Sequence, residues 1–189
     1  MREEYKTIVA WVKKGSSVID LGCGNGELLK MLKEQKYCDG IGIDYDGQCV
    51  KDCREKGLRV YNASIDEGVI KGVIRYSKKF DYAICNATLQ MLDSPAILLR
   101  DMFRISTNQI ISFPNFAKWQ NRLELLFRGR MPRWMLSGYS WYNTEHIHQL
   151  SIKDFEEYIK DRTIVEKHFS PDRKILRNLT TYTAIYWLR

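Results

Sequence analysis

The chain has 189 residues, and its 30 Lys and Arg against 23 Asp and Glu give a formal net charge of +7. A hydrophobic content of 44% and a charged content of 28% are typical of a globular protein, and no apolar run reaches the about 20 residues that a membrane-spanning helix needs. Residues 1–6 lack the pattern of a secretory signal. The five cysteines are odd in number and include no Cys-x-x-Cys pair, and this pattern favours reduced thiols in the cytoplasm over disulfides or a zinc site.

The first third of the chain alternates helical and extended patterns. Apolar residues at helical spacing predict a first helix that ends near Gly15, and Gly57 stops the third helix. The predicted helices span 5–14, 27–35 and 48–56, and the predicted strands span 17–21, 40–43 and 59–61.

The remainder continues this alternation and then changes character. A loose helix or loop at 66–75 is followed by a strand at 80–85, a helix at 96–103 and a strand at 109–113, whereas 115–148 is rich in aromatic residues and Arg without a clean period. Ser151 and Asp154 open a helix that covers 154–159. Two late strands, 163–166 and 180–187, flank a long loop that contains Pro171.

This order predicts an α/β fold, with a mostly parallel, doubly wound sheet of seven strands and helices on both faces. We expect one domain over residues 1–189, with 116–150 as an insert or lid before the last strands.

The loop after the first strand is rich in glycine. Gly22, Gly24 and Gly26 follow an apolar strand that carries Asp20, and a helix begins directly after them. Glycines allow a sharp turn and a close approach of the backbone to a ligand, and the helix directs its free N–H groups to the same place. A Gly-x-Gly-x-Gly loop differs from the Gly-x-Gly-x-x-Gly dinucleotide fingerprint. It resembles motif I of the class I S-adenosylmethionine-dependent methyltransferases.

The second predicted strand supplies another acid. Asp44 ends that strand about 20 residues after the glycines, where Rossmann-like sites place the acid that accepts from ribose hydroxyls. Tyr45 follows it and is suited to cover an adenosine face. The alternative is a glycine turn before a helix, followed by an unrelated surface Asp. It requires two correctly ordered strand ends to coincide by chance.

Beyond these motifs the chain resembles the methionine biosynthesis protein MetW family, which is similar in fold to the class I methyltransferases. The resemblance runs from the first helix to about residue 170. Its most specific part is three blocks in order: Ile-Ser-Phe-Pro-Asn-Phe-Ala-Lys-Trp at 111–119, Arg-Gly-Arg-Met-Pro at 128–132 and Trp-Tyr-Asn-Thr-Glu-His-Ile-His at 141–148.

The resemblance implies a site for S-adenosylmethionine or S-adenosylhomocysteine. The residues that it implies for cofactor binding are Asp20, Gly22, Cys23, Gly24, Gly26, Asp44, Tyr45, Ser64, Ile65 and Asn86. One position departs from the pattern, since Ser64 stands where an Asp commonly accepts from the adenine amino group. A hydroxyl accepts more weakly than a carboxylate, and Asp66 can substitute if the loop shifts.

The resemblance also implies a role in methionine biosynthesis beside a homoserine O-acyltransferase of the MetX type. Two functions stay open: a cofactor-binding accessory subunit of that enzyme, and a stand-alone methyltransferase that acts on a small molecule. RNA methylation is a weaker option that rests on charge alone, because the densest basic stretch, 122–133, interleaves Arg with apolar residues. Such a stretch favours a solvated rim or a protein interface over a nucleic-acid groove.

No catalytic residue is assigned from the sequence. His146 and His148 are the candidates for a base, because imidazole titrates near neutrality. The alternative is that one packs under the aromatic loop while the other is exposed. Asn-Ala-Thr-Leu at 86–89 lacks the Pro-Pro run of exocyclic-amine methyltransferases, and no Pro-Cys pair offers a nucleophile. Methyl transfer from a sulfonium can proceed by positioning alone.

Overall fold

The computed structural model describes residues 3–66, 79–133, 139–172 and 175–189. Its elements, in chain order, are α1 Glu3–Trp11, β1 Ser17–Leu21, α2 Glu27–Lys36, β2 Asp39–Asp44, α3 Gly47–Glu55, β3 Arg59–Asn62, β4 Phe80–Asn86, the 3-10 helix η1 Leu89–Met91, α5 Pro95–Ile105, β5 Ser106–Pro114, α6 Trp119–Arg128, α7 Ile152–Tyr158, β6 Ile164–Ser170, α8 Arg177–Thr180 and β7 Thr183–Leu188. The predicted loose helix or loop at 66–75 lies, except for Asp66, outside the described residues.

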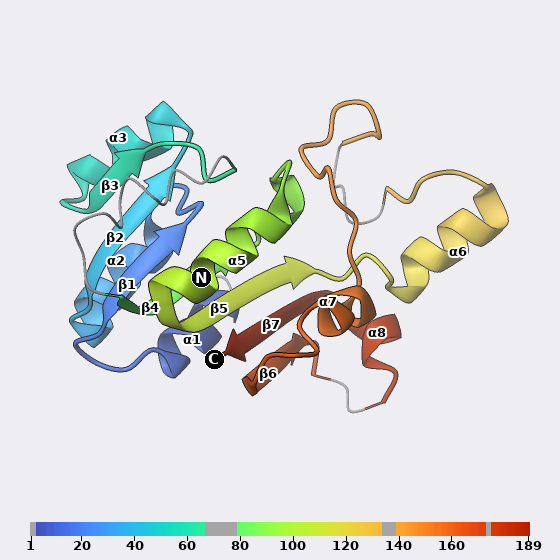
Figure 1. Ribbon diagram of the computed structural model, residues 1–189. Coiled ribbons are helices and arrows are strands. Elements are labelled where there is room, and N and C mark those ends of the chain that lie inside the picture. Colours follow the sequence, from blue (N-terminus) through green and yellow to red (C-terminus); the bar gives the residue numbers. More distant parts are fainter. Residues whose placement is uncertain (1–2, 67–78, 134–138, 173–174) are drawn as a thin grey trace.

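The strands form one seven-stranded sheet in the order β3-β2-β1-β4-β5-β7-β6 (Figure 1). Strands β1 to β5 pair in parallel, and β7 runs antiparallel to both of its neighbours, β5 and β6. The prediction of a mostly parallel sheet of seven strands is confirmed.

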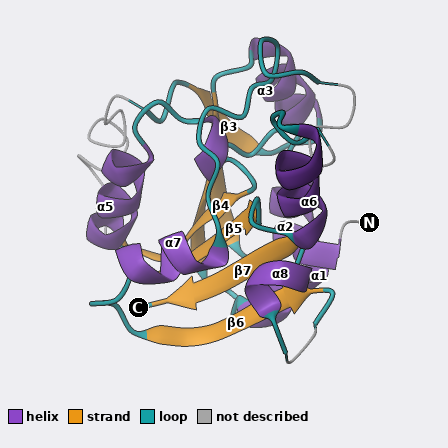
Figure 2. Ribbon diagram, turned by 90° about the vertical axis from the view of Figure 1, so that its right-hand side faces the viewer, coloured by secondary structure: helices purple, strands orange, loops and turns teal. Residues whose placement is uncertain are grey.

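Side chains that alternate along the strands form two apolar layers, one on each face of the sheet. One face of the sheet, which includes Ile19 and Ile111, packs against α5 and α7. The opposite face, which includes Val18 and Ile110, packs against α1 and α2, and Figure 2 shows α5 and α2 on opposite sides of the strands. Successive strand residues point to opposite faces, so both faces of this sheet are covered.

The strand order places a crevice at the carboxyl end of β1. Strand β1 lies between β2 and β4, so the chain leaves β1 towards one edge and later returns to pair on its other side. In open α/β sheets, ligands bind where the strand order reverses in this way.

Two segments differ from the prediction. Helix α6 forms within 115–148, where the sequence analysis assigns no clean period. Only Asn121 of its ten residues is buried, so the apolar residues of α6 do not face the core. Gly129, at φ 58, ends α6 as a left-handed C-cap and was the available signal. The predicted strand 180–187 begins late, because Thr180 closes the short helix α8.

Among the described helices, none combines the length and the apolar character that a membrane span requires.

Candidate functional site

A cavity of about 810 Å³ opens at the carboxyl ends of β1, β2 and β4. It brings together every predicted site residue except Gly26: Asp20, Gly22, Cys23, Gly24, Asp44, Tyr45, Ser64, Ile65 and Asn86 all line it. Residues that are up to 66 positions apart in sequence therefore meet at the switch point of the sheet.

Backbone bonds hold the glycine loop against the end of β2. The N–H groups of Gly22 and Cys23 donate to the Ile43 carbonyl at 2.9 and 3.1 Å. A side chain on Gly22, at φ +76, would meet Thr88 at 2.5 Å, whereas one on Gly24, at φ +52, would meet no protein atom within 4 Å. Gly24 therefore presents bare backbone to the cavity.

Gly26, which is also a predicted cofactor-binding residue, is not among the residues that line the cavity. It is the left-handed N-cap residue of α2, with φ 76. A Cβ there would lie 2.6 Å from Leu58 and 2.7 Å from the Cys53 sulfur. The third glycine thus permits the turn into α2 and the packing of α3 against the loop.

Asp44 organises the junction between β2 and the glycine loop. Its Oδ2 accepts from the Gly24 N–H at 2.7 Å, and its Oδ1 accepts from the Asp46 N–H at 3.0 Å. The Asn62 amide donates to the carbonyls of Asp44 and Tyr45, which braces this turn from β3. Tyr45 is exposed at the rim.

Asp20 is the most deeply buried carboxyl of the cavity, with 2% of its surface exposed. Its Oδ1 has no hydrogen-bond partner among the described residues. Burial, and then the neighbouring Asp44 carboxylate, raise the pKa of Asp20 to about 7. A buried carboxyl without a partner on one oxygen favours a ligand that donates a hydrogen bond or carries positive charge.

The opposite wall comes from the ends of β3 and β4. Ser64 and Asp66 both line it, and Asp66 accepts from the Ser94 N–H at 3.2 Å through Oδ1. Asn86 accepts at Oδ1 from the Ser112 hydroxyl of β5 at 2.7 Å. Ala87 follows at φ 52, a left-handed conformation that is uncommon for a residue with a side chain.

The segment 144–148 forms one edge of the cavity. Thr144, Glu145 and Ile147 line it, and the Ile147 and His148 N–H groups donate to the Gln90 carbonyl at 2.9 and 3.0 Å. The Glu145 carboxylate is the main cause of a raised Tyr45 pKa, which places its charge near Tyr45 at the rim of the cavity.

The two candidate bases are not among the residues that line the cavity. His146 is half-buried, and this burial lowers its pKa although Glu145 opposes the shift. His148 is exposed, with Nε2 3.4 Å from the Asp93 carbonyl oxygen. This arrangement matches the packing alternative rather than a base aimed into the cavity.

Several lining residues were not predicted. Tyr5 reaches the cavity from α1, Glu27 and Leu28 from the first turn of α2, and Met91 from η1. The spacing of apolar residues predicts that Tyr5 lies in a helix, but it does not indicate that this helix approaches the glycine loop.

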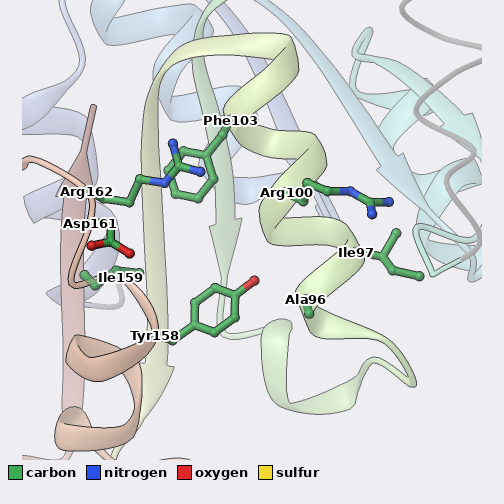
Figure 3. A pocket seen from close by; sticks show the side chains of 8 residues that line it. All are labelled: Ala96, Ile97, Arg100, Phe103, Tyr158, Ile159, Asp161 and Arg162. Atoms are coloured by element: carbon green, nitrogen blue, oxygen red, sulfur yellow. The ribbon is translucent and has the colours of Figure 1, made fainter.

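A second cavity, of about 630 Å³, lies between α5 and α7 (Figure 3). It contains none of the predicted site residues, and its lining includes Arg100, Asp161 and Arg162. The Arg162 guanidinium lies 4.0 Å from the centre of the Phe103 ring. Its chemistry is therefore different from that of the first cavity.

Comparison with solved structures identifies the fold. A S-adenosylmethionine-dependent methyltransferase from Mesorhizobium loti superposes with a TM-score of 0.72 at 14% identity, covering 98% of this chain and 97% of that one. The plantazolicin methyltransferase BpumL in complex with SAH superposes with a TM-score of 0.64 at 15% identity, covering 98% and 79%. The chain has the class I methyltransferase fold.

Comparison with sequences gives the family. The bifunctional methionine biosynthesis protein MetXA/MetW of Rhodopirellula baltica is 30% identical in an alignment of 173 residues that covers 86% of this chain. The chain spans 27% of the length of that relative. The family described as methionine biosynthesis protein MetW matches residues 2–187. The chain belongs to the MetW family.

Proposed function

We propose that the chain binds S-adenosylmethionine or S-adenosylhomocysteine in the cavity at the end of β1 and supports a separate homoserine O-acyltransferase of the MetX type. The observation that carries the binding is the pairing of Asp20 and Asp44 around a glycine loop at the switch point. The structure of BpumL, which has the same fold, is that of its complex with SAH.

The residues present fit this cofactor. Asp44 would accept from the ribose hydroxyls, because each of its oxygens has accepting capacity beyond its one backbone bond. Asp20 would face the ammonium group of the methionine part, and the open space beside Gly24 admits the ligand close to the backbone. Ser64 and Asp66, which also line the cavity, would accept from the adenine amino group. When bound, S-adenosylmethionine would supply an electrophilic methyl group.

Replacement of Asp44 should weaken cofactor binding. Asp44→Ala removes the acceptor for the ribose hydroxyls and frees the Gly24 N–H, so we expect a loss of about 1–3 kcal/mol of binding free energy. Asp44→Asn, which keeps one acceptor oxygen, should lose less. Calorimetric titration with S-adenosylmethionine measures both, and equal affinity for all three proteins would contradict the assignment.

The partner proposal rests on an exposed apolar surface within 116–148. Helix α6 projects from the sheet (Figure 1), and Leu126 and Phe127 on it are 73% and 77% exposed. An apolar patch rimmed by arginines is typical of a protein interface. The Rhodopirellula relative carries both MetXA and MetW in its name, which points to an acyltransferase as the occupant.

Two substitutions test this surface. Leu126→Asp with Phe127→Asp should weaken co-purification with the homoserine acyltransferase by at least about tenfold, as expected when interface anchors are lost, and should lower that enzyme's activity. Arg128 and Arg130 are less suitable targets, because both pair with Glu124, at 3.7 and 3.1 Å. Changing their charge would disturb the segment itself.

Ile175→Asp is the matched control, since Ile175 is 77% exposed, as is Phe127, but lies outside 116–148. It should leave the association unchanged, and cofactor binding should be near normal in all variants. Unchanged co-purification together with methyl transfer to a small acceptor would support the alternative, a stand-alone methyltransferase. Residues 116–150 would then be a substrate lid.

A further inference from the structure

The cavity at the end of β1 has an unusual charge for a protein with a net charge of +7. Six acidic residues line it: Asp20, Glu27, Asp44, Asp66, Asp93 and Glu145. No Lys, Arg or His belongs to its lining within the described parts of the chain.

The acids surround the space from several elements. Asp20 and Asp44 lie at the inner end, where Asp20 is buried with Oδ1 unpartnered among the described residues. Glu145 lies at the rim, close enough to Tyr45 to dominate the shift of that residue's pKa. A ligand in the cavity is thus exposed to negative charge at both ends.

The second cavity does not share this acidic lining. The cavity between α5 and α7 has two arginines against one acid, and Figure 3 shows all three side chains. The Lys56 ammonium donates to the Asn25 carbonyl of the glycine loop at 2.6 Å, yet Lys56 is not part of the lining.

S-adenosylmethionine carries a sulfonium that S-adenosylhomocysteine lacks, so the two ligands differ by one positive charge and a methyl group. Both ligands carry the same ammonium group, so either one would compensate Asp20, and only the sulfonium distinguishes them. Charge interactions are strong where solvent is excluded, so a lining with six acids and, among the described residues, no base favours the ligand with the additional positive charge. We propose that the cavity selects the sulfonium form over the demethylated form. This selection rests on the proposed function and makes the chain a reader of the methyl donor rather than of its product.

The test is calorimetric titration of the full chain with three ligands at low and high salt. The ligands are S-adenosylmethionine, S-adenosylhomocysteine and sinefungin, which replaces the sulfonium with a carbon that bears an amine. We expect the two cationic ligands to bind about tenfold or more tightly than S-adenosylhomocysteine. The preference should shrink as salt rises, because ions screen the exposed acids.

Glu145→Gln assigns the preference to the cavity. It should weaken the binding of the two cationic ligands and reduce the difference between their affinity and that of S-adenosylhomocysteine, which should bind nearly as before. Glu157→Gln, an exposed acid of α7 outside the cavity, is the control and should change nothing. Equal or tighter binding of S-adenosylhomocysteine would overturn the inference and leave the proposed function standing. Failure of all three ligands to bind would overturn both.

Discussion

Gly24→Val should abolish detectable cofactor binding while the protein remains folded. The Gly24 Cβ would meet no protein atom within 4 Å, so a valine side chain there extends into the space that the ligand needs. Forcing it against a bound ligand costs on the order of 3 kcal/mol, a loss of about 100-fold or more in affinity. Calorimetric titration and thermal unfolding of the same preparation measure both parts of this expectation.

Gly129→Val is the matched control for backbone strain. Gly129 has φ +58 against +52 for Gly24, and it too has no atom within 4 Å of a built Cβ, but it lies outside the cavity. Both variants should lose about 1–2 kcal/mol of stability from the left-handed conformation, and only Gly24→Val should lose the ligand. If Gly24→Val unfolds cooperatively on heating and binds the cofactor with unchanged affinity, the glycine loop is not the site.

Asp20 should make the free protein less stable as pH rises from about 4 to about 7, whereas the lowered pKa of His146 contributes in the opposite direction. The pKa of Asp20 is raised from 3.8 to about 7, so in this window the unfolded chain has lost a proton that the folded protein retains. Stability falls where the folded state binds more protons. Below the pKa that Asp20 has in the unfolded chain, its burial costs no folding stability. Above about pH 7 the cost in stability is constant. At about 1.4 kcal/mol per pKa unit, it amounts to at most about 4 kcal/mol.

Asp20→Asn should remove the loss of stability that Asp20 causes, and should make the free protein more stable than the original at pH 8. The same change should weaken cofactor binding. Asp161→Asn, an exposed acid outside this cavity, should leave the pH profile unchanged. Denaturant unfolding at a series of pH values measures the effect. Parallel profiles for Asp20→Asn and the original protein would contradict the assigned burial penalty. A cation bound beside Asp20 should lower its pKa, so cofactor binding near pH 7 should release protons.

The predictable part of the site is local in sequence. The glycine loop and Asp44 are short motifs at strand ends, and parallel strands bring their carboxyl ends together. Nine of the ten predicted residues line one cavity for this reason. Gly26 was assigned to the ligand because its spacing does not distinguish a ligand contact from a packing contact, and the neighbours that explain it, Leu58 and Cys53, come from a later segment.

The unpredicted part depends on tertiary packing. Tyr5 and Glu145 approach the cavity from segments about 15 residues before and about 120 residues after the loop. No local pattern specifies that docking, which for the later segment uses bonds to the Gln90 carbonyl. Helix α6 was missed although Trp119, Leu123 and Leu126 recur at helical spacing, and all three remain exposed instead of entering the core. Its exposed apolar residues are the ones that the proposed partner would cover.

Calorimetric titration of the purified chain with S-adenosylmethionine, S-adenosylhomocysteine and NAD tests the central claim most directly. We predict saturable binding of S-adenosylmethionine or S-adenosylhomocysteine at one site, competition between the two, and no binding of NAD at the same concentrations. In this proposal the Asp20 and Asp44 carboxylates and the Gly24 backbone, which line one cavity, would form that site. Tight binding of NAD without any binding of either sulfur-containing ligand would contradict it.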